Sequence, residues 1–504
     1  MAMRRLVALL ALVLAAPAAA ATIHGAPNVP LILGTEAADH VVTGKGTHFV
    51  QVAWGAVDSV DCGSGFNVVS ADLSDKVSAS CKVVSRRLSV DPSTNPQSQH
   101  ETAVEPDDAA WGSTVVAAYQ VGRFATGASS NIGFAVSRDA GRTWQRGLLP
   151  SVTVESSPPG TQRAASDPTV AYDAVHAVWL IGMLTLEQGS SHVLVARSTD
   201  GLHWSAPVTV ATGPLLDKDW FACDNGATSP FRGRCYATYT DDEKNITVSQ
   251  WSTDGGVTWS QPVTETKVLV GTQPVVLADG TLVVVAGDFQ NQAATSGAIA
   301  GARSTDGGVT FTPVTVSSLE SAANGPTRAI SLPSLEADAA GTIYAAWADC
   351  RFRPACTAND IVFSSSHDEG VTWSTPLRIP TAPVSSTLSS FIPGFAADPQ
   401  HPGRLALVYA YFVPHSCEVN ACRLGIGFVQ SPDGGASWTV PLRLDTQPMS
   451  MSWLARAGGR MVGDYFSAEF AQDRIVAVFA LAVPPLNGRF REGIFTASLK
   501  PLGP

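Results

Sequence analysis

One short phrase recurs along the chain and constrains its fold more than any other feature. The stretch STDGGVTW at 252–259 has four full-length copies and one shortened copy: SRDAGRTW at 137–144, STDGLHW at 198–204, STDGGVTF at 304–311, SHDEGVTW at 366–373 and SPDGGASW at 431–438. The shared aspartates are 52 to 65 residues apart. A period of that size is typical of stacked supersecondary units.

Each unit has the pattern of four short strands. In the third unit, KDWFACD (218–224), RCYATYT (234–240) and NITVSQWS (245–252) precede the phrase. These are β-branched and aromatic runs bounded by Gly, Asp and Pro, which predicts antiparallel strands. The phrase itself predicts a hairpin turn, because Asp bonds nearby amides and Gly accepts a positive φ. The repeats are therefore predicted to be structural and not catalytic.

Repeated four-stranded units favour an all-β chain folded as a β-propeller. We predict seven blades, with six as the alternative, from first strands near Glu101, Asp167, Asp217, Gln273, Ser331, Phe391 and Gly463. The last unit has no repeat, and the N-terminal region is predicted to supply its fourth strand and close the ring. Residues 22–100 are interpreted as an N-terminal extension that contributes to closure, and residues 101–504 as the propeller.

Residues 1–21 have the layout of a secretory signal peptide. Two arginines precede an apolar run that ends in small residues, which predicts cleavage near Ala20 or Ala21. A retained membrane anchor is the alternative, but the apolar run is short. We therefore expect a secreted or periplasmic protein with no membrane span. The net charge of −11 argues against nucleic acid as a partner. We also expect the protein to be a monomer.

The eight cysteines form four local pairs. In an exported chain this pattern predicts disulfides at Cys62–Cys81, Cys223–Cys235, Cys350–Cys356 and Cys417–Cys422. Zinc is the competing interpretation, but no C-x-x-C doublet or neighbouring histidine cluster supports it.

The six phrases match S-x-D-x-G-x-[TS]-W with small variations, and with them the chain resembles the sialidase superfamily, also called the bacterial neuraminidase repeat or Asp-box family. The resemblance implies a propeller whose Asp boxes lie away from the substrate, and exo-α-sialidase chemistry. It also implies an arginine triad for the substrate carboxylate, a Tyr nucleophile and an Asp acid/base. Tyr465, in GDYFSAEF, occupies the place of the nucleophile. The family's Phe/Tyr-Arg-Ile-Pro motif has no counterpart, since RFRP at 351–354 lies in the fifth unit.

Propeller geometry brings the loops that enter the first strands, and those that join strands two and three, to one mouth. The predicted catalytic residues there are Tyr465, Asp464, Asp349 and Asp167, and the predicted substrate-binding residues are Arg351, Arg163, Asp219 and Trp220. Two alternatives remain open: Tyr465 as a packing aromatic, and an Arg351–Asp349 structural ion pair. No cofactor is expected, although oxygen-rich loops around one axis also suit a structural calcium ion.

These features predict an exported sialidase-like glycoside hydrolase that acts on glycans or glycoconjugates. One alternative is a non-catalytic propeller that binds glycans or proteins. The other is a different carbohydrate-active chemistry on the same scaffold, because fold alone does not fix function.

Overall fold

The computed structural model describes residues 20–503, except 27, 268, 292, 324, 326 and 414–420. Most of the predicted signal peptide (1–21) and Cys417 of the fourth predicted disulfide lie outside these residues. The described chain is all-β, as predicted, and its only helical pieces are two 3₁₀ turns, Pro354–Cys356 and Met451–Trp453. Among these residues, no helix is long and apolar enough to cross a membrane.

From β9 onward, four-stranded antiparallel meanders follow one another along the chain. The strands are β9 (Ala103–Trp111), β10 (Thr114–Arg123), β11 (Ser129–Ser137) and β12 (Gln145–Leu148); β13 (Ala164–Asp173), β14 (Val178–Glu187), β15 (Ser190–Ser198) and β16 (Val208–Gly213); β17 (Leu216–Cys223), β18 (Cys235–Asp241), β19 (Ile246–Ser252) and β20 (Val263–Lys267); β21 (Val270–Val276), β22 (Leu282–Phe289), β23 (Ser296–Ser304) and β24 (Thr312–Glu320).

The remaining meanders have shorter outer strands. They are β25 (Ser334–Ala337), β26 (Ile343–Asp349), β27 (Asp360–Ser366) and β28 (Leu377–Arg378); β29 (Ser389–Ala397), β30 (Leu405–Val413), β31 (Arg423–Ser431) and β32 (Leu442–Arg443), with β33 (Met449–Ser450) beside β31; and β34 (Ser467–Ala471), β35 (Arg474–Ala482) and β36 (Glu492–Leu499).

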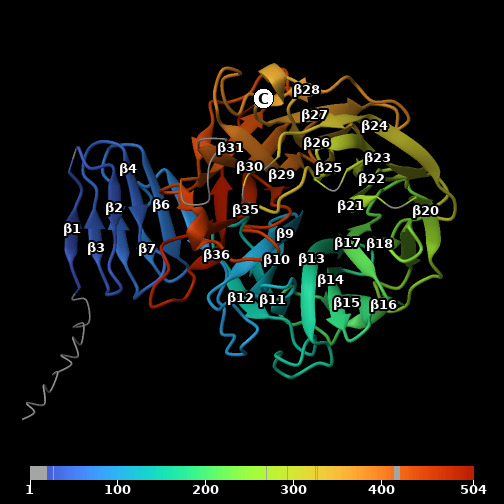
Figure 1. Ribbon diagram of the computed structural model, residues 1–504, viewed down its shortest axis with the longest axis horizontal. Helices are drawn as coiled ribbons and strands as arrows, with labels where there is room; N and C mark the ends of the chain where they lie inside the picture. The colour runs from blue at the N-terminus through green and yellow to red at the C-terminus, as the bar shows by residue number, and fades with distance from the viewer. Residues whose placement is uncertain are drawn as a thin grey trace, which may run out of the picture.

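The meanders stand around a common axis, as the blades of a β-propeller do (Figure 1). The first strand of each contacts the first strand of the next, and β34 contacts β9, so the chain closes into a ring. Large buried aromatic side chains, among them Trp347, Phe363 and Phe395, fill the space between sheets. The innermost strands therefore surround a central channel.

The six repeated phrases are the hairpins between third and fourth strands. In the third meander, the Asp254 carboxylate accepts the amides of Val257 and Thr258, each at 2.9 Å, and the Thr258 hydroxyl at 2.6 Å. The Ser252 hydroxyl donates to Asp254 at 2.8 Å and accepts the Gly256 amide at 2.9 Å. In an antiparallel meander the third strand ends at the face opposite the one where the first strand starts. The boxes therefore lie at the mouth of the channel opposite the one where the first strands start.

The N-terminal region has an architecture that the sequence analysis did not predict. Its strands are parallel and lie in two sheets, β1 (Thr22–His24), β3 (His40–Val42), β5 (Ser59–Asp61) and β7 (Lys76–Val77), and β2 (Leu31–Leu33), β4 (His48–Gln51), β6 (Asn67–Asp72) and β8 (Val83–Arg87). Equivalent positions recur every 15 to 19 residues. The chain thus winds as a small β-solenoid beside the ring (Figure 1).

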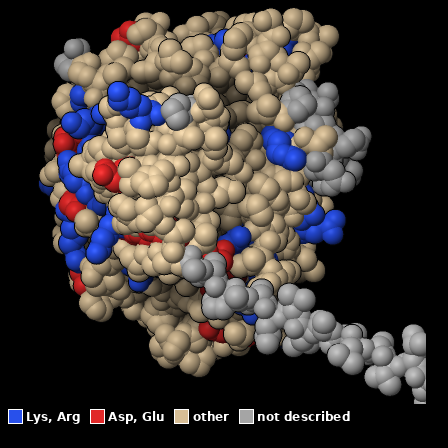
Figure 2. Space-filling view, turned by 90° about the vertical axis from the view of Figure 1, so that its left-hand side faces the viewer, with Lys and Arg blue, Asp and Glu red and all other residues tan. Residues whose placement is uncertain are grey.

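The solenoid joins the ring directly, because β8 pairs antiparallel with β36. Figure 2 shows the side of the molecule on which the solenoid lies. Most of the molecular surface on this side carries no charged side chain. Lys and Arg gather toward one edge of this view, with Asp and Glu among them. The charges on this side are therefore mixed in sign.

Buried aspartates hold successive coils of the solenoid together. The Asp39 amide donates to Asp58 Oδ1 at 2.6 Å, and the Asp58 amide donates to Asp75 Oδ1 at 2.9 Å. The other oxygen of Asp58 is buried without a hydrogen-bond partner. Burial, with added repulsion from neighbouring carboxylates, raises the pKa of Asp58 to about 6.

Three of the predicted disulfides are present, Cys62–Cys81, Cys223–Cys235 and Cys350–Cys356. They close short loops in the solenoid, the third meander and the fifth meander. Cys417–Cys422 cannot be compared, since Cys417 lies outside the described residues.

We predict that Asp254→Ala lowers the free energy of unfolding by about 1–3 kcal/mol, because its turn amides lose their acceptor. Denaturant unfolding measures the effect, and Glu243→Ala, an exposed acidic residue of the same meander, is the control. An unchanged free energy of unfolding in Asp254→Ala would contradict the structural role of the box.

We also predict that the solenoid loses stability as pH rises through about 6. A carboxyl whose folded pKa is raised binds its proton more tightly when folded, so its contribution is full below the unfolded pKa and lost above the folded one. Asp58→Asn should remove about 2 kcal/mol of this dependence. Hydrogen-exchange protection of the β3 and β5 amides at pH 4.5 and 7 measures it, with exposed Asp61→Asn as the control.

Candidate functional site

A cavity opens where the first strands begin, at the mouth opposite the Asp boxes. Five of the eight residues predicted for the site line it: Asp167, Asp219, Trp220, Asp464 and Tyr465. They come from β13, β17 and the segment before β34. The cavity contains about 460 Å³ of empty space, open solvent included, and Lys218 and Gln273 also line it.

Backbone bulges aim charged side chains at this mouth. The register of β9, β13 and β17 with their neighbours shifts at Glu105, Asp167 and Lys218. These residues have φ values of 53°, 46° and 53°. A bulge redirects a side chain, and the left-handed backbone costs a residue other than glycine about 1–3 kcal/mol. Three such residues thus lie at or beneath this cavity.

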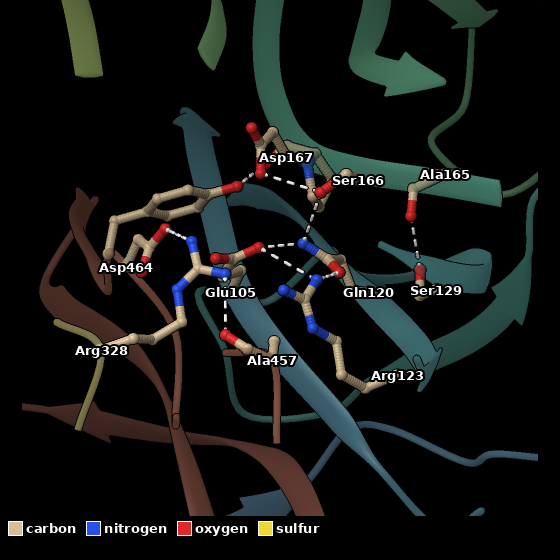
Figure 3. Close-up of polar contacts among 12 residues, drawn as sticks. Glu105, Gln120, Arg123, Ser129, Ala165, Ser166, Asp167, Arg328, Ala457 and Asp464 are labelled. Atoms are coloured by element: carbon tan, nitrogen blue, oxygen red, sulfur yellow. Dashed lines mark hydrogen bonds and ion pairs between the residues drawn. The ribbon is translucent and has the colours of Figure 1, made fainter. Parts of the chain in front are cut away.

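Asp464 is the most strongly paired carboxylate of the cavity. Its Oδ2 atom accepts hydrogen bonds from Lys218 Nζ and Arg328 Nη2, each at 2.7 Å, and the Arg328 contact is visible in Figure 3. Burial alone would raise the pKa of Asp464, but the two cations outweigh burial and hold it well below its usual range. Asp464 is therefore ionised at neutral pH.

Asp219 lies in the same cavity, but its pKa is shifted in the direction opposite to that of Asp464. Its side chain is 1% exposed, and among the described residues neither carboxyl oxygen has a hydrogen-bond partner. Burial, reinforced by the negative charge of Asp167, raises the pKa of Asp219 well above its usual range. These surroundings favour the protonated form of the Asp219 carboxyl group, which could donate its proton.

Glu105 forms a second layer beneath the cavity. Its Oε2 atom accepts a hydrogen bond from Gln120 and lies 3.8 Å from Arg123 Nη1, and Figure 3 shows it between these two side chains and Arg328. Burial, followed by the charge of Asp464, raises the pKa of Glu105 to about 8. This group holds a proton near neutral pH, one layer behind Asp464.

Tyr465 is buried and is not activated in this structure. Its hydroxyl donates to the carbonyl of Pro168 at 3.1 Å, and its ring meets Trp220 edge-on, with centroids 5.1 Å apart. Burial and the surrounding carboxylates raise the pKa of Tyr465 well above its usual range. Among the described residues, the hydroxyl of Tyr465 donates to a main-chain carbonyl and not to a carboxylate. Tyr465 therefore forms a wall of the cavity in this structure.

Asp349, Arg351 and Arg163 are not among the residues that line the cavity. Arg351 forks onto Asp349, with Nε at 2.9 Å and Nη2 at 2.7 Å, and its remaining donors reach Ser317 and the carbonyl of Ser318. Arg351 and Asp349 therefore form a local ion pair. Arg163 is exposed next to β13, and its guanidinium contacts Gln188 at 3.4 Å.

Three residues of the site were missed by sequence reasoning: Glu105, Arg123 and Arg328. Glu105 precedes a proline, as Asp167 does, and this shared acidic-Pro pair in two first strands was a usable signal. Arg328 stands in an irregular segment between β24 and β25 and had no signal.

A family model for the BNR repeat-like domain matches residues 113–337. This range covers four of the six Asp boxes and continues into the fifth meander. Residues 113–337 therefore contain a BNR repeat-like domain.

No curated protein matches this BNR-repeat chain. Similar solved structures include a protein of unknown function from Dyadobacter fermentans, with 14% identity, 67% of this chain and 95% of that chain covered, and a TM-score of 0.40. A Trypanosoma rangeli sialidase in complex with the inhibitor DANA has 12% identity, 79% and 55% coverage and a TM-score of 0.39. A Penicillium chrysogenum α-L-arabinanase complexed with arabinobiose has 11% identity, 82% and 97% coverage and a TM-score of 0.39. Similarity at this level assigns neither a substrate nor the role of any residue.

We predict that Lys218→Met destabilises the BNR-repeat chain by about 3 kcal/mol, because it leaves the buried Asp464 carboxylate with only part of its counter-charge. The loss should be smaller at pH 5 than at pH 8, since protonation of Asp464 relieves the unpaired charge. Denaturant unfolding at both pH values measures it. The double variant Lys218→Met/Asp464→Asn should recover part of the stability, and an equal loss at both pH values would contradict the pairing.

Proposed function

We propose that the chain is a glycoside hydrolase that uses Asp219 as general acid and Asp464 as the ionised carboxylate. One observation supports this most: two carboxyl groups of a single cavity have pKa values shifted in opposite directions. Opposed shifts of this kind separate the acid from the base or nucleophile in glycosidases. The match of residues 113–337 to the BNR repeat-like domain and the resemblance of the Asp boxes to those of sialidases support the same reaction class.

In this proposal the remaining residues position the substrate. Asp167 lies 3.7 Å from Lys218 Nζ and keeps the lysine between two carboxylates. Trp220 provides an aromatic surface for a sugar ring. Tyr465 supports Trp220 from the side and closes the cavity wall.

The exo-α-sialidase specificity implied by the resemblance requires cations that are available to a substrate carboxylate. Among the described residues, Lys218 is the cation that lines the cavity, and Arg328 lies beside it. Both already bind Asp464. We therefore propose a neutral glycoside as the preferred substrate, with a sialoside as the competing case.

We extend the proposal to the setting of the protein. The ring is proposed to have seven blades, with β8 as the outermost strand of the last. The three disulfides support an exported protein, with cleavage near Ala20 or Ala21 and a monomeric state as parts of the proposal. No cofactor is proposed for the reaction, and a structural calcium ion stays the alternative.

The test is hydrolysis of a panel of aryl glycosides, one of them an aryl sialoside. Asp219→Asn and Asp464→Asn should each lower kcat about 10²–10⁴-fold, the usual contribution of general acid–base catalysis. Tyr465→Phe should fold and retain activity. Asp219→Asn should also remove the alkaline limb of the pH profile, because activity needs Asp219 protonated.

Two results would overturn the proposal. Hydrolysis of the sialoside alone, abolished by Tyr465→Phe, would restore the tyrosine mechanism. Binding of glycans with no turnover of any aryl glycoside would assign a non-catalytic propeller.

A further inference from the structure

A second cavity continues along the central channel behind the candidate site. It shares Trp220 and Gln273 with the first cavity, and its other end reaches Trp111 and Tyr172, near the ends of β9 and β13. It contains about 890 Å³ of empty space, open solvent included. This far cavity therefore occupies the half of the channel toward the Asp-box face.

Four carboxyl groups line the far cavity: Asp107, Asp108, Glu336 and Glu469. We call them the channel cluster; they come from β9, β25 and β34. Among the described residues that line this cavity there is no Lys, Arg or His. In the first cavity Asp464 is paired with Lys218 and Arg328, whereas the channel cluster has no such cation among the described lining residues.

Asp108 carries the strongest sign of a missing partner. Its side chain is 3% exposed, and among the described residues no group donates a well-formed hydrogen bond to either carboxyl oxygen. Burial raises the pKa of this carboxyl, against a smaller lowering by the nearby Ser467 hydroxyl, which donates to the main-chain carbonyl of Asp108 at 3.4 Å. Asp107 differs, because its Oδ2 atom accepts the Val170 amide at 2.7 Å. A buried carboxyl group without a partner is costly unless it is protonated or meets a cation.

The carboxyl groups of the channel cluster also repel one another. Burial, with the charges of Asp107 and Asp108, raises the pKa of Glu336, and burial raises the pKa of Asp107 to about 7. The cluster therefore holds protons near neutral pH that an incoming cation would displace.

The geometry favours an organic cation over a metal ion. Among the described residues, no three His, Cys, Asp or Glu side chains are grouped closely enough to hold one metal ion. At the outer end, the Trp111 and Tyr172 rings lie 5.3 Å apart, and Trp111 is 47% exposed. Aromatic faces attract ammonium groups, and separated carboxylates suit a ligand with two ammonium groups on a carbon chain.

We propose that the far cavity binds a linear organic diamine. One ammonium group lies between Asp108 and the two glutamates of the channel cluster. The chain extends along the channel, and the second ammonium group lies against Trp111 and Tyr172. This site lies beyond the proposed catalytic cavity, with which it shares Trp220 and Gln273, and it does not depend on the hydrolase assignment.

The test is calorimetric titration of the full chain at pH 7.5 with 1,4-diaminobutane. We expect saturable binding that Asp108→Asn and Glu469→Gln each weaken at least about tenfold, as the loss of a charge-assisted hydrogen bond does. Glu265→Gln is the matched control, because Glu265 is also a buried carboxyl with a pKa raised to about 7 by burial but does not line this cavity. It should bind the diamine as the wild type does.

Two further measurements do not depend on the variants. Titration of the wild type in phosphate and in Tris should give different heats, since the channel cluster releases protons when it binds the diamine. The uncharged analogue 1,4-butanediol should not bind. Equal heats in both buffers, equal binding of the diol, unchanged affinity in Asp108→Asn, no saturable binding, or displacement of the diamine by stoichiometric CaCl₂ would each overturn the proposal.

Discussion

The antiparallel pairing of β36 with β8 is the contact on which the rest of the structure depends. It brings a strand from the start of the described chain into the sheet that contains its last strand, and it makes the solenoid continuous with the ring. A ring of sheets encloses a channel of fixed width only when it is closed. The pairing of β36 with β8 reinforces the contact of β34 with β9 that closes the ring, and both cavities are lined by residues from several blades of that ring.

The regular part of the fold was predictable because its signals are local. Each Asp box carries its own hydrogen-bond acceptors and glycines, so six hairpins and their flanking strands could be read directly. The solenoid had no such signal, since its strands are as short as two or three residues and pair in parallel across a full coil. One of its constraints is visible only in three dimensions: at Gly63 a Cβ atom would lie 1.8 Å from the Gly44 carbonyl oxygen of the previous coil.

The candidate site was predictable to the extent that topology determines it. The starts of the first strands converge, which placed Asp167, Asp219, Trp220, Asp464 and Tyr465 around one cavity. The sequence raised the Arg351–Asp349 ion pair as one of two alternatives, and the structure contains it. Nothing in the sequence indicated that Arg328, in an irregular segment, reaches Asp464. The sequence also could not distinguish a protonated aspartate from an ionised one, since that difference comes from neighbours contributed by other blades.

The bulged residues have a consequence for how this protein can change. A glycine at position 105, 167 or 218 would relax the backbone, so the substitution that most relieves local strain would also delete an ionisable side chain at or beneath the mouth. Selection for stability and selection for the site therefore oppose each other at these three positions. Directed evolution for thermal tolerance alone would be expected to replace the bulged residues of the mouth first. The Asp boxes would be retained, because their side chains stabilise the turns in which they lie.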